Sequence, residues 1–448
     1  MEFYTKYLKA LRYNKAPNEK VLQEKNIIYQ KIKTKPLENN INEIKLKSEI
    51  NPYIAIHLLE SERIKLGAFY TPPYIVKKVF ELIYPYYLNH KNHTVIADIA
   101  AGCGAFLFPI LSLGADYRVA DCDKEAIAFL RQYFIYEKIF ETNSLKNISR
   151  TKFNIKEDQF LIIVGNPPYN DTTSLYKKDE KGFFECDPDI YDRDIGISFL
   201  KAFAKLNADI ICVLHPLSYL IKEANFKRLK GFKETYRLKE SYIFLSNEFS
   251  FTKTAKFPII IALYEKNQCG MDYEYIRNFN FKFLNKEGEF VLGKWITTDG
   301  YINKYPPRTG DPKISPIDIY FYSFRDLNSL LRNATFLGEQ KDNTIVVTVE
   351  NFYKYAYLHC LKKFVLKMKK EKDNLWIFGN LSPLINKNFV EKNKKLFIIY
   401  AIKDHKLFGE NYELIKKLFS FYQIDEKKID LQKIEKKLNK YFNLLYKL

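Results

Sequence analysis

The chain has 448 residues, of which 47% are hydrophobic; this is enough for two or three domains with apolar cores and excludes an intrinsically disordered protein. Lys and Arg number 72 against 53 Asp and Glu, and the net charge of +19 favours a polyanionic partner unless it reflects only a lysine-rich composition. The six cysteines and six histidines show no disulfide or metal-site spacing, and the longest apolar run, about 257–264, is too short to cross a membrane.

The pattern of the chain changes twice. Residues 1–66 predict a polar, helical N-terminal segment, and because the N-terminus lacks the apolar core of a signal peptide we expect a cytoplasmic protein. Residues 67–268 alternate short β-branched runs with helix-length segments, which predicts an α/β domain around a mostly parallel sheet. Residues 269–448 mix strand-like pieces, such as 344–349 and 396–402, with lysine-rich helical pieces, and predict a separate α+β domain.

Polar residues recur at a constant interval within the α/β segment. Asp98, Asp121, Asn143 and Asn166 are 22 or 23 residues apart, and all but Asn143 directly follow a clear apolar run. One strand–helix unit takes about this many residues, and ligands bind beyond the carboxyl ends of parallel strands. Each residue alone could serve as an ordinary turn or cap, but four in register indicate a nucleotide-like ligand along one sheet edge.

A glycine turn follows the first of these strands. The segment 98–106 reads DIAAGCGAF, and it lies between a strand and a predicted helix over 106–113. Glycine permits a sharp turn and a close approach of a ligand to the backbone. A third glycine and a G-K-[ST] sequence are missing, which favours a ligand without a pyrophosphate over a dinucleotide or a P-loop nucleotide.

The second and fourth strand ends carry the residues that would contact such a ligand. Asp121 offers a carboxylate acceptor for ribose hydroxyls, or it caps the next helix; capping by Asp123 would leave Asp121 to face the ligand. After the fourth strand, the Asn166 side-chain oxygen and the Pro167 carbonyl are rigid acceptors, and Tyr169 adds a planar surface. This set suits a planar substrate with an amino group; the alternative is an ordinary Asn-Pro turn.

Four motifs in this order resemble a known family. They are Phe69-Tyr70-Thr71-Pro72, the segment 98–106, Asp121-Cys122-Asp123 and Asn166-Pro167-Pro168-Tyr169. They resemble the motifs of N6-adenine DNA methyltransferases, and their order resembles the gamma class of type II restriction–modification enzymes, over about residues 60–265. The resemblance implies a Rossmann-like domain that binds S-adenosylmethionine and a C-terminal target-recognition domain. It also implies N6 methylation of an adenine in a specific double-stranded DNA sequence, which protects that sequence from a separately encoded cognate restriction endonuclease.

The resemblance also implies a role for each matching residue. The catalytic segment would be Asn166, Pro167, Pro168 and Tyr169. The cofactor-binding residues would be Tyr70, Thr71, Pro72, Asp98, Ala100, Gly102, Asp121, Asn143 and Asn166. Tyr169 and, from the segment before the last apolar strand, Phe251 and then Phe249 would stack on the extruded base. The chain departs from the family with Asn143, where many relatives have Asp, and with Ile99, where Pro is common.

The expected chemistry is methyl transfer to an amine without a covalent intermediate. The two acceptors of Asn166 and Pro167 would bind the two N–H groups of the amine and localise its lone pair. C5-cytosine methylation would need a cysteine nucleophile, and none lies in this loop. A base inside a duplex is inaccessible, so it must be flipped out at a cost of a few kcal/mol, which stacking on Tyr169 would offset in large part.

Two further parts of the chain have a predicted relation to DNA. The polar insert 170–197 has a length typical of a functional lid or a disordered loop, and we predict that it is mobile without DNA. Arg308 and Arg325 are candidate base readers. The candidate phosphate contacts are the lysine cluster Lys362, Lys363, Lys367, Lys369, Lys370 and Lys372 and the terminal-helix lysines Lys427, Lys428, Lys433, Lys436, Lys437 and Lys440, all of which could equally be solvated.

Three alternatives stay open. Release-factor glutamine N5-methyltransferases also carry the Asn-Pro-Pro-Tyr motif, but they are shorter and lack the upstream motif and a large basic C-terminal domain. RNA base methyltransferases are the second alternative. The third is a non-catalytic DNA specificity subunit, which the complete segment 166–169 argues against.

Overall fold

The computed structural model describes residues 71–102, 104–131, 134–169, 185–246, 257–297, 301–306, 314–324, 327–371, 384–409 and 411–446. The described residues form two compact units. The first unit comprises those within 1–253 together with 259–276 and 281–289, and the second comprises those within 254–258, 277–280 and 290–448. The predicted N-terminal segment 1–66 lies outside the described residues.

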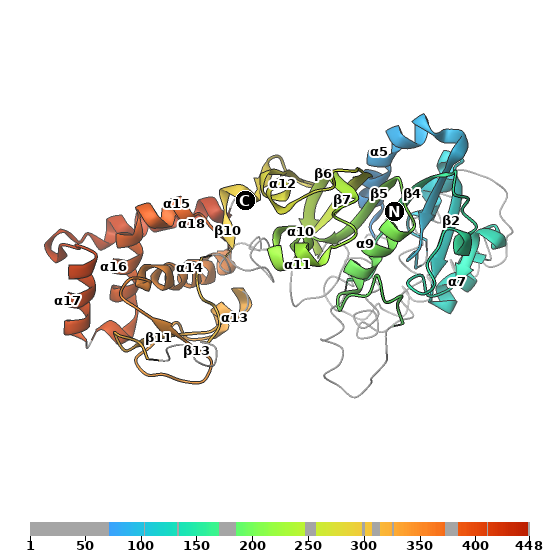
Figure 1. Cartoon of the computed structure of the whole chain (residues 1–448). Helices are drawn as coiled ribbons and strands as arrows, with labels where there is room; N and C mark the ends of the chain where they lie inside the picture. The colour runs from blue at the N-terminus through green and yellow to red at the C-terminus, as the bar shows by residue number, and fades with distance from the viewer. Residues whose placement is uncertain are drawn as a thin grey trace, which may run out of the picture. The chain divides into compact units, whose positions relative to one another are not determined.

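A nine-stranded sheet forms the centre of the first unit (Figure 1). Its spatial order is β3-β2-β1-β4-β5-β7-β6-β8-β9. The strands are β1 (Thr94–Asp98), β2 (Asp116–Asp121), β3 (Ile139–Glu141), β4 (Phe160–Gly165), β5 (Ile210–Pro216), β6 (Tyr236–Leu245), β7 (Pro258–Lys266), β8 (Asn280–Phe283) and β9 (Glu289–Val291). The first five are mutually parallel, whereas β7 runs antiparallel to β5. The sheet therefore continues beyond residue 268, where we predicted a domain boundary.

The central strands are buried because both faces of the sheet are covered. Every residue of β1 and β5 is buried, as are all but the first residue of β4. Ile96 in β1 is paired with Tyr117 in β2 and with Ile162 in β4. Apolar runs without alternation are typical of strands in such a doubly covered parallel sheet. The predicted α/β fold class is confirmed.

Helices connect the strands and pack against the sheet (Figure 1). In the first unit they are α5 (Pro73–Asn89), α6 (Leu107–Leu113), α7 (Lys124–Arg131), α9 (Ile195–Lys205), α10 (Ser218–Ile221), α11 (Glu223–Arg228) and α12 (Tyr273–Asn278). The right-handed strand–helix–strand connection brings the carboxyl ends of parallel strands to one edge. The residues that follow β1, β2 and β4 therefore meet there, as the 22- or 23-residue spacing predicts.

The second unit combines small antiparallel sheets with helices, as predicted for an α+β domain. β11 (Ile319–Tyr322) pairs with β12 (Phe336–Leu337) and β13 (Thr344–Val347), and β10 (Ile296–Thr297) pairs with β14 (Leu384–Ile385). The helices are α13 (Leu327–Arg332), α14 (Phe352–Glu371), α15 (Lys387–Lys392), α16 (Lys394–Asp404), α17 (Tyr412–Phe421) and α18 (Leu431–Tyr446). Within the described residues, no helix is both long and apolar enough to span a membrane.

One predicted strand of the second unit is wrong. The segment 396–402 lies inside α16, whereas the strand-like segment 344–349 does contain β13. An apolar run of this length fits a buried helix as well as a buried strand, and periodicity alone does not separate them. In α16, Phe397, Ile398 and Ile402 are buried, and the helix packs against α14 and α18.

Candidate active site

The glycine turn after β1 is closed by backbone and side-chain bonds. The Ala100 amide donates to Asp98 Oδ1 (3.2 Å), and the Ala101 amide donates to the Ala120 carbonyl at the end of β2 (3.0 Å). Gly102 has a φ of +50°, and among the described residues, its chain neighbours aside, no heavy atom lies within 4 Å of the position that its Cβ would occupy. The turn therefore leaves open space beside Gly102, where a ligand can approach the backbone.

The carboxylate of Asp121 joins this turn to the loop that follows β2. Its Oδ2 accepts a hydrogen bond from the Gly102 amide (2.7 Å), and its Oδ1 accepts one from the Asp123 amide (2.9 Å). Asp123 caps α7, as predicted, because its Oδ1 accepts from the Ala126 amide (3.3 Å). Each carboxylate oxygen has two lone pairs, so Asp121 retains acceptor capacity for a ligand hydroxyl.

The two carboxylates form an electronegative corner at the sheet edge. Asp98 is 2% exposed, and burial, supported by the charge of Asp121, raises its pKa to about 8 even though the bond from Ala100 acts in the opposite direction. Burial also raises the pKa of Asp121. A carboxyl group that is desolvated and close to another carboxylate favours a cationic neighbour, so this corner is suited to a positively charged ligand.

Glycine at the end of β4 allows the fourth strand to reach this corner. Gly165 has a φ of +151°, and a Cβ built on it would lie 2.8 Å from Asp98 Oδ1. Residues other than glycine hardly adopt this backbone conformation. Asn166 follows directly, so the close approach of Gly165 and Asp98 brings the predicted catalytic segment next to the glycine turn. No sequence motif predicts this role of Gly165.

The side chain of Asn166 is bound to the first motif. Its Nδ2 donates to Thr71 Oγ1 (3.2 Å), and Thr71 is 5% exposed. Pro72 precedes α5 and accepts hydrogen bonds from the amides of Ile75 and Val76 through its carbonyl. Two motifs that are 95 residues apart in the sequence therefore meet at one point, as their joint resemblance to one family implies.

Tyr169 is buried at the end of the same segment. It is 8% exposed, and a Cβ built on Gly196 in α9 would lie 3.0 Å from its Cβ. Burial raises its pKa well above the usual value, although a bond with Asn166 acts in the opposite direction. In this conformation the side chain is buried and its Cβ lies against α9, whereas the predicted stacking role requires an accessible ring face.

Asn143 is used by the local backbone. Its Oδ1 accepts from the Leu145 amide (3.0 Å), and its Nδ2 donates to the Glu185 carbonyl (2.8 Å). It follows β3, which confirms that its weak apolar run is a strand. The side chain thus caps a turn and holds the segment that begins at residue 185. Both of these bonds are made to the protein backbone, whereas the predicted contact is with a cofactor.

The described part of the insert 170–197 is anchored to its surroundings. Asp187 accepts hydrogen bonds from the amides of Asn147 (2.6 Å) and Ile148 (3.0 Å) and pairs with Lys205 (3.0 Å). The remainder of the insert, 170–184, lies outside the described residues.

Five predicted site residues also lie outside the described residues. They are the predicted DNA-contact residues Phe249, Phe251, Arg308 and Arg325 and the predicted cofactor-binding residue Tyr70.

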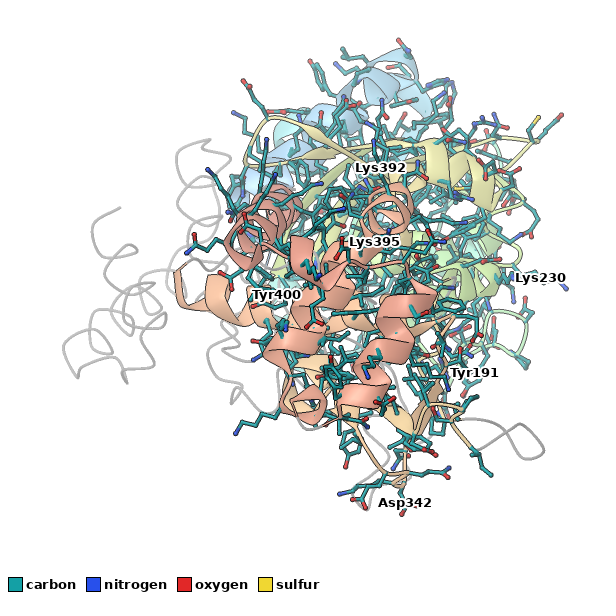
Figure 2. All side chains as sticks on the ribbon, turned by 90° about the vertical axis from the view of Figure 1, so that its left-hand side faces the viewer. Tyr191, Lys230, Asp342, Lys392, Lys395 and Tyr400 are labelled. Atoms are coloured by element: carbon teal, nitrogen blue, oxygen red, sulfur yellow. The ribbon has the colours of Figure 1, made fainter. Side chains whose placement is uncertain are left out.

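Two of the predicted phosphate-binding lysines have partners within the second unit. Lys362 donates to the Asn333 carbonyl, and Lys363 pairs with Asp404 (2.9 Å). Lys369 lies in α14, and its side chain is outside the described part. Exposed lysines also occur on the neighbouring helices, and Figure 2 labels two of them, Lys392 and Lys395.

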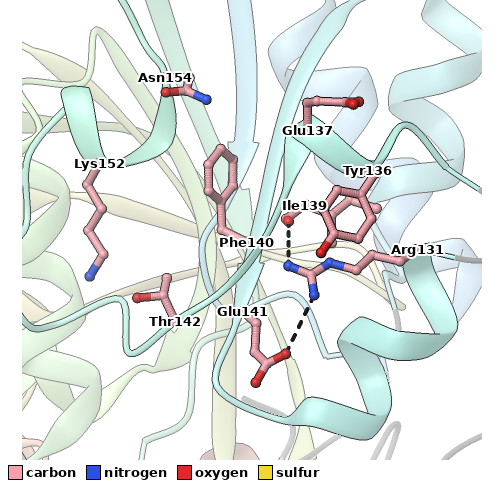
Figure 3. Close-up of a pocket in the computed structure, with 9 residues that line it drawn as sticks. All are labelled: Arg131, Tyr136, Glu137, Ile139, Phe140, Glu141, Thr142, Lys152 and Asn154. Carbon is pink, nitrogen blue, oxygen red and sulfur yellow. Dashed lines mark hydrogen bonds and ion pairs between the residues drawn. The ribbon is translucent and has the colours of Figure 1, made fainter.

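A groove of about 480 Å³ lies along the outer edge of β3 (Figure 3). Arg131 Nη2 donates to the Ile139 carbonyl (3.3 Å), Nη1 pairs with Glu141 (3.5 Å), and the guanidinium lies 4.3 Å from the ring centroid of Tyr136. The lining residues are Arg131, Tyr136, Glu137, Ile139, Phe140, Glu141, Thr142, Lys152 and Asn154. The side chains of the predicted catalytic segment do not line it. Arg131 thus occupies one carbonyl of β3, the strand at this end of the sheet order.

Comparisons with known proteins match methyltransferases. The family model of the Eco57I restriction-modification methylase matches residues 118–251. A release factor glutamine methyltransferase from Buchnera aphidicola subsp. Baizongia pistaciae is 23% identical over 159 residues, which are 35% of this chain and 55% of that protein. The chain thus spans about half the length of this curated relative.

The chain is also similar to solved structures. TrmN from Thermus thermophilus has 14% identity and a TM-score of 0.30, and the match covers 49% of this chain and 53% of that one. Magnesium protoporphyrin IX methyltransferase from Synechocystis, solved with bound S-adenosylmethionine, has 12% identity and a TM-score of 0.26, with 52% and 100% covered. The family model and the curated relative support the predicted methyltransferase, and neither resolves its substrate. Among the described residues, no group of three or more His, Cys, Asp or Glu side chains could hold a metal ion.

Proposed function

We propose that this chain is an S-adenosylmethionine-dependent DNA methyltransferase that acts on the N6 amine of an adenine flipped out of a specific double-stranded sequence. One observation carries the proposal. Asn166 follows Gly165, whose backbone lies against Asp98 in the glycine turn, and it is hydrogen-bonded to Thr71 of the first motif. An amide acceptor, an acidic corner and an open glycine turn thus converge at the carboxyl edge of the sheet.

The acidic corner fits the proposed cofactor. S-adenosylmethionine is a cation at its sulfonium and carries an ammonium group, and when bound it supplies an activated methyl group. Asp121 would provide negative charge for such a ligand, and a bound cation would favour ionisation of Asp98, whose pKa is about 8. The open position at Gly102 provides room beside the backbone. Asp121 would accept hydrogen bonds from ribose hydroxyls.

The catalytic segment would hold the amine. Because Nδ2 of Asn166 donates to Thr71, the amide is oriented with Oδ1 as the acceptor for one N–H group of the substrate. The carbonyl of Pro167 would accept the second N–H group. Two fixed acceptors favour a pyramidal nitrogen with a localised lone pair, so the protein contributes positioning and electrostatic stabilisation to the transfer.

DNA is the substrate class that the charge of the chain and its matched family favour. The chain carries a net charge of +19, and the matched family is a restriction-modification methylase by name. A phosphate backbone is the polyanion that such a charge attracts. The curated relative supports a second candidate, a protein glutamine N5-methyltransferase, because the two acceptors of the segment would suit a side-chain amide as well as an adenine amine.

A methyl-transfer assay tests the proposal. The full chain is incubated with tritiated S-adenosylmethionine in three separate reactions. The first contains unmethylated genomic DNA, the second total RNA and the third a release factor. We expect label in DNA and N6-methyladenine after digestion to nucleosides. Label only in the release factor or only in RNA would replace the proposal with the corresponding alternative. Single-molecule sequencing of DNA from an expressing host would then identify the recognised sequence and hence any cognate endonuclease.

A further inference from the structure

The first turn of α9 lies between two buried tyrosine side chains, the Cβ of Tyr169 and the ring of Tyr219. A Cβ built on Gly196 would lie 3.0 Å from Cβ of Tyr169 and 2.5 Å from the hydroxyl oxygen of Tyr219. Tyr169 and Tyr219 are 8% and 1% exposed. The backbone of Gly196 therefore lies between the proposed catalytic segment and Tyr219, close to both.

Tyr219 is fixed to the same turn by a hydrogen bond. Its hydroxyl donates to Asp194 Oδ1, the oxygen that also accepts from the Gly196 amide (3.1 Å) and caps α9. One carboxylate oxygen thus connects α10, which contains Tyr219, with the start of α9. A hydrogen bond to a carboxylate is stronger than one between neutral groups, so this partly buried contact restrains both elements.

The backbone of Asp194 is restrained as well. Its amide donates to Asp192 Oδ1 (2.9 Å), and Asp192 is paired with Arg228 of α11, whose Nε lies 3.2 Å from Oδ2. Lys201 of α9 also lies 3.7 Å from Asp192. The start of α9 therefore has little freedom to move relative to α10 and α11.

The ring of Tyr219 is supported from the sheet. His215, at the end of β5, stacks on it with a centroid separation of 5.4 Å and an interplanar angle of 12°. Nε2 of His215 lies 2.7 Å from the hydroxyl of Tyr264 in β7. These contacts link Tyr169, α9 and Tyr219 to two central strands through packed side chains.

We propose that Tyr219 is a positioning residue for methyl transfer: with Asp194 it fixes the first turn of α9, and Gly196 passes this restraint to Tyr169 and the segment 166–169. The inference rests on the proposed function, because it assigns Tyr219 a role in the geometry of that site. Tyr219 acts through Gly196 and Tyr169, so its loss should affect the transfer step while the cofactor corner around Asp98 and Asp121 is retained.

Removal of one hydroxyl group tests this role. In Tyr219→Phe we expect kcat for methyl transfer to DNA to fall about 10-fold, because small misplacements of reacting groups are costly. The Kd of S-adenosylmethionine should stay within about 2-fold of the wild-type value. Tyr236→Phe is the matched control, since Tyr236 is also 1% exposed and donates to a carbonyl, that of Ala208, away from the segment. It should keep the wild-type kcat.

A double-mutant cycle provides an independent test. Gly196→Ala places a methyl group against the Tyr219 hydroxyl and should lower kcat more than Tyr219→Phe does. The combination should recover part of that loss, because the closest contact is removed with the hydroxyl. If thermal denaturation shows that Tyr219→Phe is unfolded, Asp194→Asn replaces it; Asn still caps the helix but accepts the tyrosine bond without a charge, and kcat should again fall.

The outcomes separate the two proposals. Wild-type kcat in Tyr219→Phe, or a loss that appears in the Kd of S-adenosylmethionine instead of kcat, would overturn the positioning role. Absence of rescue in the cycle would also overturn it, because the restraint would not pass through Gly196. A wild-type chain that binds S-adenosylmethionine but transfers no methyl group to DNA would instead overturn the proposed function.

Discussion

At the edge of the sheet, close contacts between residues restrict which amino acids a position can accept. Gly165 lies so close to Asp98 that a side chain at position 165 would overlap with the Asp98 carboxylate. In addition, its φ of +151° is almost restricted to glycine. The contact closes the corner between β1 and β4 and at the same time removes water from Asp98. One glycine thereby sets the position of Asn166 and adds to the burial that raises the pKa of Asp98.

We expect Gly165→Ala to lower the free energy of unfolding by about 2–4 kcal/mol, since the cost of backbone strain is added to the cost of steric overlap with Asp98. Gly231→Ala is the matched control. Gly231 also has a positive φ, of +87°, but nothing lies within 4 Å of its Cβ position, so only the backbone strain remains. Urea denaturation of both variants measures the difference. Equal destabilisation of the two variants would show that the close approach of Gly165 and Asp98 has no energetic consequence.

Replacement of Asn166 tests the proposed acceptor directly. We expect Asn166→Ala to lower methyl transfer at least ~100-fold, the size of effect found when one preorganised polar group is removed from a reaction centre. Binding of S-adenosylmethionine, measured by calorimetry, should change little. Thr71→Val removes only the hydroxyl that binds Nδ2, so it should reduce transfer less, and Thr71→Ser should retain most of it. An Asn166→Ala variant that transfers at the wild-type rate would exclude the clamp.

Among the elements, α18 has the clearest division between two faces. Ile434, Leu438 and Phe442 are buried, whereas the lysines at 433, 436, 437 and 440 are exposed and follow one another at the spacing of a single helix face. Such a lysine stripe is either solvated or in contact with phosphates, and the structure is compatible with both.

A salt series distinguishes these roles for the α18 stripe. If Lys433, Lys436, Lys437 and Lys440 bind phosphates, their joint replacement by Gln should weaken DNA binding and reduce the slope of log K against log salt by about 0.9 for each phosphate that is no longer neutralised. Lys77→Gln with Lys416→Gln is the control, since both lysines are exposed and lie beside a glutamate. An unchanged slope in the quadruple variant would show that the stripe is only solvated.

Elements differ in how well the sequence predicts them. The parallel strands are predictable because doubly buried strands produce uninterrupted apolar runs, and the spacing of Asp98, Asp121 and Asn166 follows from the length of a strand–helix unit. The segment 396–402 is not predictable in the same way. It lies in α16, which packs against two other helices, and a helix buried in this way has an apolar run like that of a buried strand. The contact of Gly196 with Tyr219 depends on tertiary packing and has no local signal.

At the scale of the whole molecule, buried ionisable groups make stability depend on pH in opposite directions. Asp98 ionises with a pKa of about 8 in the folded chain and 3.8 as an isolated group, so the folded state binds more protons between these values. The free energy of unfolding therefore falls as pH rises, by up to ~1.4 kcal/mol per pH unit. Burial lowers the pKa of His215 and His359 from 6.5 to about 4, so these two residues make stability rise with pH over that range.

Comparison with Asp98→Asn isolates the contribution of Asp98 between about pH 6.5 and 8, because both histidines are neutral there in the folded chain and their remaining protonation in the unfolded chain affects both proteins equally. We expect Asp98→Asn to remove a decline in stability that the wild type shows across this window, measured by urea denaturation at several pH values. Asp116→Asn is the control. Burial acts to raise the pKa of Asp116, but bonds from Lys138 and Arg118 hold it below the ordinary value, so it does not titrate in this window. A wild-type curve parallel to that of Asp98→Asn would show that Asp98 is ionised throughout. A cationic ligand at the corner should flatten the wild-type decline in the same way, since it favours the ionised carboxylate.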